Sequence, residues 1–550
     1  MKKGDTHAVS PFFHLRLRLS RMRLIFAFLF LATPALAQGY DVAEKDIATL
    51  QADMTAGRVT AAELVRAYEA RIAAIDRAGP TLNSVIAVNP DALTEAEALD
   101  AERKAKGPRG PLHGIPILIK DNIETADPMP TTAGSLALAD NITHRDAPVV
   151  ARLRAAGAII LGKANLSEWA NIRSDHSFSG WSGVAGLVKN PYALDRSSCG
   201  SSAGSGAAVA ASLAAAALGT ETDGSLVCPG SFNGIVALKP TLGLVSRTHI
   251  IPIAHSQDTA GPMTRSVADA ALLLTAMAGS DPDDSATVAA DAHRRDYAMA
   301  LAAASLKGKR LGVVVPVDDS AAGKVYAAAL ASLSAAGAEL VPIPDFAQHA
   351  GRHGDELVVL EFELKHDLNA YLATLPPNQS QSQSQPRTLD DVIAFNRASP
   401  RELVLFGQEI FEAAEARGEL SDPAYRAALA RLKKGARTAL NKSFAHYHVD
   451  ALIEPTAQPA FRIDLVRGDA HSGSESSSIP AIAGYPHLTV PMGLVKGLPL
   501  GLSLVGPRWS EVALLALGAA AEKALPPRQP PHFRLSVEGE GSDGLDSALH

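Results

Sequence analysis

Helix-like segments and short apolar runs alternate along this chain, and this alternation constrains the fold more than any other feature of the sequence. Residues 149–156 have a helical pattern and are followed at 158–162 by an apolar run of strand length. The apolar run at 115–119 follows a glycine, which suits a buried strand. Alternation of this kind is typical of α/β sheets. Aromatic residues make up only 5%, whereas the chain has 43 glycines, which favours tight α/β packing over an aromatic-rich β-sandwich.

The same patterns predict the other elements. Helices are expected at 42–78, 92–104, 267–277 and 510–524, and strands at 311–317, 451–453, 488–490 and 500–505. An alanine-rich helix should begin at the 199–206 loop, with Ser205 as its N-cap, and run to about residue 218. The region 356–445 should be mostly helical and interrupted by a polar, low-complexity surface loop at 379–385. From residue 526 to residue 550 we expect a flexible C-terminal tail.

The N-terminus has the pattern of a secretory signal peptide. Four arginines between residues 16 and 23 precede an apolar run, Leu24–Ala32, and a small-residue cleavage pattern at 35–37. We therefore expect a signal peptide at 1–37, a single large domain at 38–525 and a periplasmic or secreted protein. Met22 is an alternative start, and an uncleaved anchor is the alternative to a signal, although the apolar run is too short for a membrane span.

Charge and composition exclude several classes of protein. The net charge of −7, without a basic patch beyond the N-terminus, argues against nucleic-acid binding. No later segment is apolar over the length of a membrane span, so stable membrane insertion is not expected. Neither a Walker A loop nor an H-E-x-x-H helix is present, and we predict no metal and no cofactor. The oligomeric state stays open, and a monomer is compatible with the sequence.

The chain has two cysteines, Cys199 and Cys228. Two cysteines exclude a small, disulfide-stapled scaffold. They can pair in an exported protein, but a bridge cannot be established from sequence, and we expect two buried thiols.

Three stretches contain residues suited to catalysis. One ends an apolar run at Lys120, one is the Gly/Ser-rich stretch that contains Ser201, and one is the stretch 219–225 that ends in Ser225. A serine hydroxyl needs a base to become a nucleophile, and a lysine can serve if burial keeps it neutral. A second serine can carry the proton between them. Consecutive backbone N–H groups around Asp223, Gly224 and Ser225 can stabilise an oxyanion.

Each of these signals also has an ordinary structural interpretation. A Gly/Ser loop before a helix is often a tight turn, and a lysine after a strand is usually a solvated strand end. Residues 200–204 also fit G-x-S-x-G, the nucleophile elbow of α/β-hydrolases, with Ser202 at its centre and Asp450 and His487 in the right order for a triad. However, no β-branched strand leads into this loop, which argues against that hydrolase.

The ordered series of motifs resembles the amidase signature family. Residues 199–240 are similar to the Gly/Ser-rich stretch that defines the family, and the similarity extends from about residue 43 to residue 524. It includes the motifs around 162–165, 189–191, 257–263 and 480–486. The resemblance implies one large α/β domain around a large, mixed, twisted central sheet covered by helices on both faces.

The resemblance also implies roles for individual residues. By position in the motifs, Lys120 is the base, Ser201 the bridging serine and Ser225 the nucleophile. The oxyanion hole corresponds to the backbone N–H groups of residues 222–225. Thr222, Asp223, Gly224 and Asn171 are thereby assigned to the oxyanion hole or to substrate binding. These positions imply a serine amidohydrolase that works through an acyl-enzyme.

The chain departs from the common family pattern at three positions. Asp223 replaces the first glycine of the usual Gly-Gly-Ser, Val227 replaces an arginine, and Cys199 replaces a glycine. These variants, with the stretch 165–171, look like the bacterial peptide amidase branch, whose members release ammonia from C-terminal peptide carboxamides. Asp223 would contact substrate or cap its own loop. The alternatives are a broader acylamidase acting on aryl or aliphatic amides, a non-catalytic binding member, and an amidotransferase subunit, which the export signal argues against.

Overall fold

The computed structural model of the protein describes residues 39–346, 353–377, 385–470 and 476–538. Eleven strands of these residues form one sheet, in the order β1-β3-β2-β6-β8-β7-β12-β13-β11-β9-β10. The pairs β2–β3, β2–β6, β11–β9 and β9–β10 are parallel, and the other pairs are antiparallel. The sheet is therefore mixed, and the predicted fold class is confirmed.

The strands are short, and most of them are buried. Their bounds are β1 Val85–Val88, β2 Pro116–Lys120, β3 Ile159–Ala164, β6 Ala216–Glu221, β7 Val236–Lys239, β8 Thr259–Thr264, β9 Arg310–Val313, β10 Glu339–Pro342, β11 Ala451–Pro455, β12 His487–Val495 and β13 Leu498–Val505. A separate hairpin pairs β4, Trp181–Ser182, with β5, Gly186–Leu187. Strands β2, β3, β6, β7 and β8 are buried along their whole length, so they show no alternation of buried and exposed residues.

Two groups of helices cover the sheet. Helices α5 and α6 pack on each other and on strands that include β6 and β12, and α7 and α16 pack on each other and on strands that include β8 and β12. The helices are α1 Ile47–Thr55, α2 Ala61–Arg71, α3 Ala92–Lys106, α4 Pro148–Ala155, α5 Ala203–Ala210, α6 Val227–Phe232, α7 Val267–Met277, α8 Ala290–His293, α9 Tyr297–Ala300, α10 Ala321–Ala335, α11 His353–Ala373, α12 Leu389–Ala398, α13 Glu409–Glu415, α14 Pro423–Tyr447, α15 Ser478–Ala483 and α16 Glu511–Ala524.

Small residues allow the close approaches in this fold. A Cβ atom added at Gly204 of α5 would lie 2.3 Å from the backbone oxygens of both Asn165 and Ser84. A Cβ atom added at Gly261 of β8 would lie 2.0 Å from the oxygen of Leu238. Neither distance is possible for a real side chain, so glycine is required where α5 and β8 meet their neighbours.

The alanine-rich helix expected up to about residue 218 is much shorter. Helix α5 ends at Ala210, and the following alanines enter β6, which lies between β2 and β8. Pairing with two neighbouring strands outweighs the helix propensity of alanine. The predicted N-cap is also wrong, because Ser202 precedes the helix and Ser205 lies inside it, where its hydroxyl donates to the Leu218 oxygen at 2.8 Å. The helix expected at 42–78 is divided into α1 and α2, which the turn at 56–60 separates.

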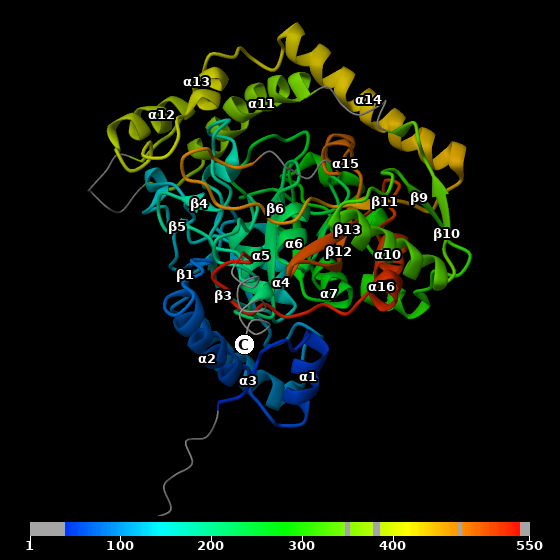
Figure 1. Ribbon diagram of the computed structural model, residues 1–550. Helices are drawn as coiled ribbons and strands as arrows, with labels where there is room; N and C mark the ends of the chain where they lie inside the picture. The colour runs from blue at the N-terminus through cyan, green and yellow to red at the C-terminus, as the bar shows by residue number, and fades with distance from the viewer. Residues whose placement is uncertain (1–38, 347–352, 378–384, 471–475, 539–550) are drawn as a thin grey trace, which may run out of the picture. The chain divides into compact units, whose positions relative to one another are not determined.

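Helices α11 to α14 form the mainly helical region predicted at 356–445, and they lie together at the top of Figure 1. A buried arginine connects this region to the rest of the domain. Arg173 Nη1 lies 2.9 Å from the Glu168 carboxylate and 3.6 Å from the carboxylate of Glu402, a residue between α12 and α13. The Arg173 guanidinium also lies 4.1 Å from the centre of the Phe406 ring. The loop prediction at 379–385 falls almost entirely outside the described residues.

The chain after α16 is not a free tail. The Arg528 guanidinium donates to the oxygens of Gly234 and Ala210, each at 2.8 Å, and pairs with Glu44. Phe533 N donates to the Pro191 oxygen at 3.0 Å. The prediction of a flexible tail from residue 526 is therefore wrong for residues 526–538, because charge and proline content did not reveal these contacts. Residues 539–550 lie outside the described residues.

The predicted signal peptide at 1–37 also lies outside the described residues. Within the part of the chain that the structure describes, no helix combines the length and the apolar character needed to cross a membrane.

Candidate active site

Lys120 ends strand β2 inside the protein rather than in solvent. Its side chain is fully buried, and Nζ lies 2.7 Å from Ser201 Oγ. Nζ also contacts Thr220 of β6, at 2.8 Å from Oγ1 and 3.3 Å from the backbone oxygen. Because β2 and β6 are adjacent parallel strands, they hold the lysine and the threonine side by side. The interpretation of Lys120 as a solvated strand end is thereby excluded.

Burial changes the acid–base character of Lys120. The loss of hydration lowers the pKa of Lys120 from 10.5 to about 7, against the opposing effect of the buried carboxylates Asp258 and Glu221. A substantial fraction of the side chain is therefore neutral near neutral pH. A neutral amine is what a general base requires.

The two predicted catalytic serines lie on adjacent segments. Ser201 precedes α5, and Ser225 lies in the turn between β6 and α6. The backbone N–H of Ser202 donates to the Ser225 oxygen at 3.2 Å, which brings the two segments together. Ser201 is 1% exposed, whereas Ser225 is 8% exposed, so Ser225 is the more accessible hydroxyl.

Cys199 and Cys228 form a disulfide, and the expectation of two buried thiols is wrong. The bridge joins the residue two positions before Ser201 to the residue three positions after Ser225. The two cysteines are 29 residues apart in sequence, but the adjacent serine segments place their Cα atoms 5.9 Å apart. The sequence could not show this proximity, which arises from the packing of α5 against α6.

The turn at 222–225 presents unoccupied backbone donors. Within the described residues, the N–H groups of Thr222, Asp223, Gly224 and Ser225 donate no hydrogen bond. The next two N–H groups, of Leu226 and Val227, both donate to the buried Glu221 carboxylate, at 2.8 and 3.1 Å. Glu221 thus fixes the end of the turn while the preceding N–H groups remain available to a developing anion.

Asp223 accepts a hydrogen bond from a neighbouring side chain. Its Oδ1 atom accepts the hydroxyl of Ser477, and the charge of Asp223 raises the pKa of the buried Glu356 of α11, after the larger effect of burial. No backbone N–H of the described residues donates to Asp223, so the interpretation of Asp223 as a cap of its own loop has no support there. The carboxylate is half-buried.

Asn171 lies in an unusual stretch of backbone. Trp169, Ala170 and Asn171 have φ angles of 48°, 53° and 78°, which are left-handed conformations. The Asn171 Oδ1 atom is buried and has no hydrogen-bond partner in the described part of the chain. It is an acceptor that a substrate N–H can satisfy, although no hydrogen bond of these residues joins Asn171 to the lysine or to the two serines.

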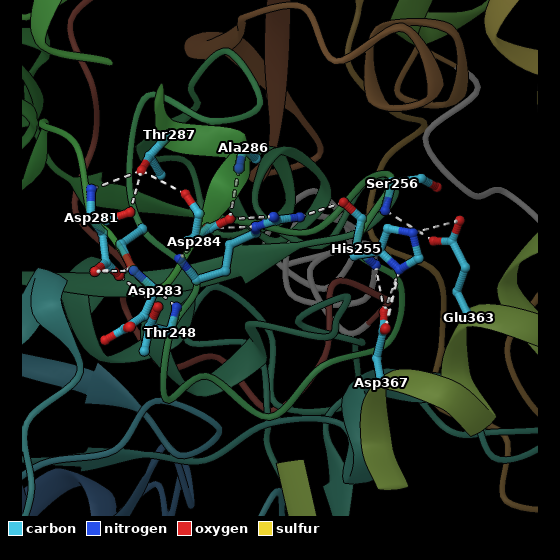
Figure 2. Close-up of polar contacts among 12 residues, drawn as sticks. Thr248, His255, Ser256, Asp281, Asp283, Asp284, Ala286, Thr287, Glu363 and Asp367 are labelled. Carbon is cyan, nitrogen blue, oxygen red and sulfur yellow. Dashed lines mark hydrogen bonds and ion pairs between the residues drawn. The ribbon is translucent and has the colours of Figure 1, made fainter. Parts of the chain in front are cut away.

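A cavity of about 460 Å³ opens beside Thr220 and Thr222. Its wall combines the apolar stretch 250–253 with polar side chains from the loops around residues 247 and 283 and from α11. Figure 2 shows polar contacts in and behind this wall, where Asp284 takes part in one set of contacts and His255 lies between Asp367 and Glu363. Asn122 lies at the end near Lys120, where its Oδ1 has no partner among the described residues.

The rival hydrolase triad is not assembled. Ser202 Oγ donates to the Thr220 oxygen, His487 Nε2 contacts Ser503 Oγ at 2.6 Å, and the Asp450 carboxylate accepts the backbone N–H of Arg310. The three residues bind different partners, as the absence of a feeding strand indicated.

One cluster has residue types that can bind a metal ion, namely His255, His366 and Asp367. Hydrogen bonds already account for the geometry of this cluster. The Asp367 carboxylate accepts hydrogen bonds from a ring nitrogen of each histidine and from the backbone N–H of His255. The cluster is mostly exposed, and it does not include Lys120 or either catalytic serine.

Sequence reasoning missed several residues that surround the predicted site. Thr220 contacts Lys120, and Asp258 accepts the hydroxyl of Thr222. Gln257 donates to both the Thr222 oxygen and Glu356. Gln257 and Asp258 belong to the family-like motif at 257–263, so their motif was a usable signal. No signal in the sequence marked Glu356, because a helical pattern does not indicate which turn of the helix faces a distant loop.

Comparison with known proteins supports the resemblance. The profile described as Amidase matches residues 63–515. The native peptide amidase of Stenotrophomonas maltophilia is 48% identical, with a TM-score of 0.83, over 89% of this chain and 99% of that chain. A protein of Arabidopsis thaliana described as "Probable amidase" is 39% identical over 90% of this chain and 93% of its own length. A subunit of the glutamyl-tRNA(Gln) amidotransferase of Synechococcus is 35% identical over 88% of this chain and 93% of its own length.

Proposed function

Because the chain belongs to the amidase signature family and is an amide-hydrolysing enzyme, we propose that it converts C-terminal carboxamides of peptides to free acids and ammonia, with Ser225, Ser201 and Lys120 as its catalytic residues. The observation that carries this proposal is the buried Lys120 amine 2.7 Å from the Ser201 hydroxyl. Burial removes the hydration that stabilises a charged lysine, so the neutral form of Lys120 is favoured at this position.

The contacts of Lys120 support its role as the base. A neutral amine has two hydrogens and one lone pair. The Thr220 oxygen and hydroxyl can accept the two hydrogens, and the lone pair is then directed to Ser201. Ser201 donates its own hydrogen to Lys120 and is free to accept one from Ser225.

In the proposed reaction, Ser225 transfers its proton to Ser201 as the Ser225 oxygen attacks the amide carbon, and Ser201 passes its own proton to the neutral amine of Lys120. The backbone N–H groups of 222–225 bind the oxyanion that forms. Ser201 then gives a proton to the amide nitrogen and takes one back from Lys120, the C–N bond breaks, and ammonia leaves an acyl-enzyme. Water attacks the acyl group, gives a proton to the same relay and releases the acid, which restores the Ser225 hydroxyl.

The peptide substrate is the finer part of the proposal. Its support is the similarity to a peptide amidase and a cavity large enough for part of a peptide beside Thr222. The broader acylamidase remains the rival, since the relatives include proteins described only as amidases. An amidotransferase subunit is the third candidate, because the similarity includes such subunits.

One experiment separates these candidates. The purified protein is incubated with peptide amides, simple aryl and aliphatic amides, and glutamine, and the products are followed by mass spectrometry and by ammonia release. Preferential conversion of peptide amides to acids supports the proposal, and equal or better conversion of simple amides favours the acylamidase. Ser225→Ala should abolish turnover while retaining the circular dichroism of the wild type. Turnover by that variant at the wild-type rate would refute the assignment of the nucleophile.

We also propose that the mature enzyme begins near Gln38 in the periplasm or outside the cell. The disulfide between Cys199 and Cys228 supports this location, because disulfides persist in oxidising compartments. Cell fractionation followed by N-terminal sequencing tests it. Recovery of an unprocessed chain from the cytoplasm would overturn it.

A further inference from the structure

The cavity of about 460 Å³ begins beside the catalytic lysine and continues to the surface. At its inner end, Asn122 is 3% exposed, and its Nδ2 donates to Thr220 Oγ1 at 3.0 Å. The same Thr220 hydroxyl contacts Lys120. Asp283 also lines the cavity and is exposed. The cavity therefore leads from the neighbourhood of the proposed base to solvent.

Asp258 fixes the cavity wall to the proposed oxyanion turn, which begins at Thr222. Its Oδ1 accepts the Thr222 hydroxyl at 2.6 Å, and its Oδ2 accepts the backbone N–H groups of Ile253 and Ala254 at 2.8 and 2.9 Å. Ile253 belongs to the apolar part of the wall. Because one carboxylate holds both segments, the cavity has a fixed place next to the turn where a substrate would react.

The cationic side chains of the wall are already paired. Arg247 donates to the Asp284 carboxylate from Nε and Nη2, at 2.9 and 2.6 Å. His255 Nδ1 lies 2.9 Å from an oxygen of Asp367. These two pairs balance each other in charge, so the remaining carboxylates of the wall give the cavity an excess of negative charge.

Each end of the cavity has an acceptor that lacks a donor. The Asp283 carboxylate has no hydrogen bond or ion pair among the described residues, and Figure 2 shows Asp283 next to Asp281. Burial and the charge of Arg145 lower the pKa of His249, the other histidine of the wall, so it is mainly neutral at pH 7. At the buried end, Asn122 Oδ1 has no partner in the described part of the chain. These features fit a ligand with an N–H at one end, an apolar stem and a cation at the other end.

We propose that this cavity binds the side chain of the substrate's C-terminal residue, and that Asp283 makes the enzyme prefer a basic residue, lysine or arginine, at that position. The inference rests on the proposed amide hydrolysis. A primary carboxamide loses only ammonia, so the acyl part of the substrate is the part large enough to fill the cavity. A lysine residue offers its backbone N–H to Asn122, its four-carbon stem to the apolar wall and its ammonium to Asp283.

The test compares kcat/KM for three N-acetyl-alanyl amides whose last residue is lysine, norleucine or glutamate. Norleucine has the apolar stem of lysine without the charge. The wild type should favour the lysine amide over the norleucine amide about fivefold, since an ion pair with an exposed carboxylate contributes modestly. The preference should decrease in about 0.5 M salt, which screens exposed charges.

Substitutions at Asp283 test its role directly. Asp283→Asn should reduce the ratio of lysine to norleucine hydrolysis to about one, and Asp283→Lys should favour the glutamate amide over the lysine amide. Asp140→Asn removes an exposed carboxylate that does not line the cavity, and this control should keep the wild-type ratio.

A wild-type ratio near one would overturn the inference, and so would a ratio that Asp283→Asn leaves unchanged. Hydrolysis of the norleucine amide shows in either case that the amidase works. If the wild type hydrolyses none of the amides, the proposed function itself fails, so the two failures are distinguishable.

Discussion

At the scale of single residues, the chemistry depends on the charge of Lys120. With the pKa of Lys120 lowered to about 7, kcat/KM should fall about tenfold per pH unit below that value, as the amine gains a proton and can no longer accept one. A stopped-time ammonia assay across the acid range measures this. Lys120→Arg remains charged at every accessible pH and should be inactive throughout. A wild-type profile that stays level down to about pH 4 would contradict a neutral lysine base.

The same lysine also affects stability. The folded protein loses the Lys120 proton near pH 7, whereas the unfolded chain keeps it up to about 10.5. Between these values the unfolded state binds more protons, so this site makes the folded state more stable as pH rises, and its full penalty is present below pH 7. Lys120→Met removes the penalty. We expect the variant to exceed the wild type in free energy of unfolding by up to a few kcal/mol at acid pH.

Urea denaturation at several pH values measures the difference between Lys120→Met and the wild type. The advantage of the variant should decrease as pH rises above 7 towards 10.5. A difference that does not vary with pH would contradict the proposed linkage.

The sequence predicted site residues where a motif marks them and missed those that act across the fold. Lys120 and Ser201 were predicted from motif positions and lie within hydrogen-bonding distance. Thr220, which accepts the other Lys120 hydrogen bonds, lies 100 residues away from the lysine in the chain. Lys120 and Thr220 meet only because β2 and β6 are neighbouring strands in this register, and strand pairing is a property of the folded sheet.

At the scale of elements, the disulfide connects the two segments that contain the serines. Closing a loop with a sequence separation of 29 residues should contribute about 3.5 kcal/mol to stability by restricting the unfolded chain. Reduction should therefore lower the melting temperature, and it should also lower kcat by loosening the segments around Ser201 and Ser225. Assays with and without a phosphine reductant measure both effects.

The control for reduction is the double variant Cys199→Ala and Cys228→Ala. It should begin with the lower stability and activity and should not respond to the reductant. An unchanged melting temperature of the reduced wild type would contradict a structural role for the bridge.

Element prediction succeeded where length and pattern agree. Helix α3 and strand β2 lie within one or two residues of the predicted bounds. It failed at 211–218, where the alanine-rich sequence favours a helix in isolation, but residues 211–215 form a turn and bend and the chain then enters strand β6, Ala216–Glu221, between two partners. Local propensity cannot report that a central position in a sheet is available.

At the scale of the whole molecule, the segment 526–538 connects distant parts of the domain. Arg528→Ala removes hydrogen bonds to Gly234 and Ala210 and an ion pair with Glu44, and it should destabilise the protein by about 1–3 kcal/mol. Thermal or urea unfolding measures the loss. The exposed Arg467, whose partner Asp464 is 4.0 Å away, provides the control, and Arg467→Ala should change stability by less than about 0.5 kcal/mol. Equal effects of the two substitutions would mean that the segment is not anchored.

The fold class was predictable because the alternation of helices and strands and the family resemblance agree. The strand order was not. Strand β12 pairs with β7, although about 250 residues separate them, and nothing local in either strand specifies the partner. Which distant strands pair depends on how their side chains pack against their neighbours in the folded core.

That strand order has a consequence for how the enzyme is made. Strands β12 and β13 join the part of the sheet built from the first half of the chain to β11, β9 and β10, yet they come after all other strands in sequence. The two parts of the sheet can therefore join only after residues 487–505 have been synthesised. We expect folding to be completed late, and for an exported chain this means after it has crossed the membrane.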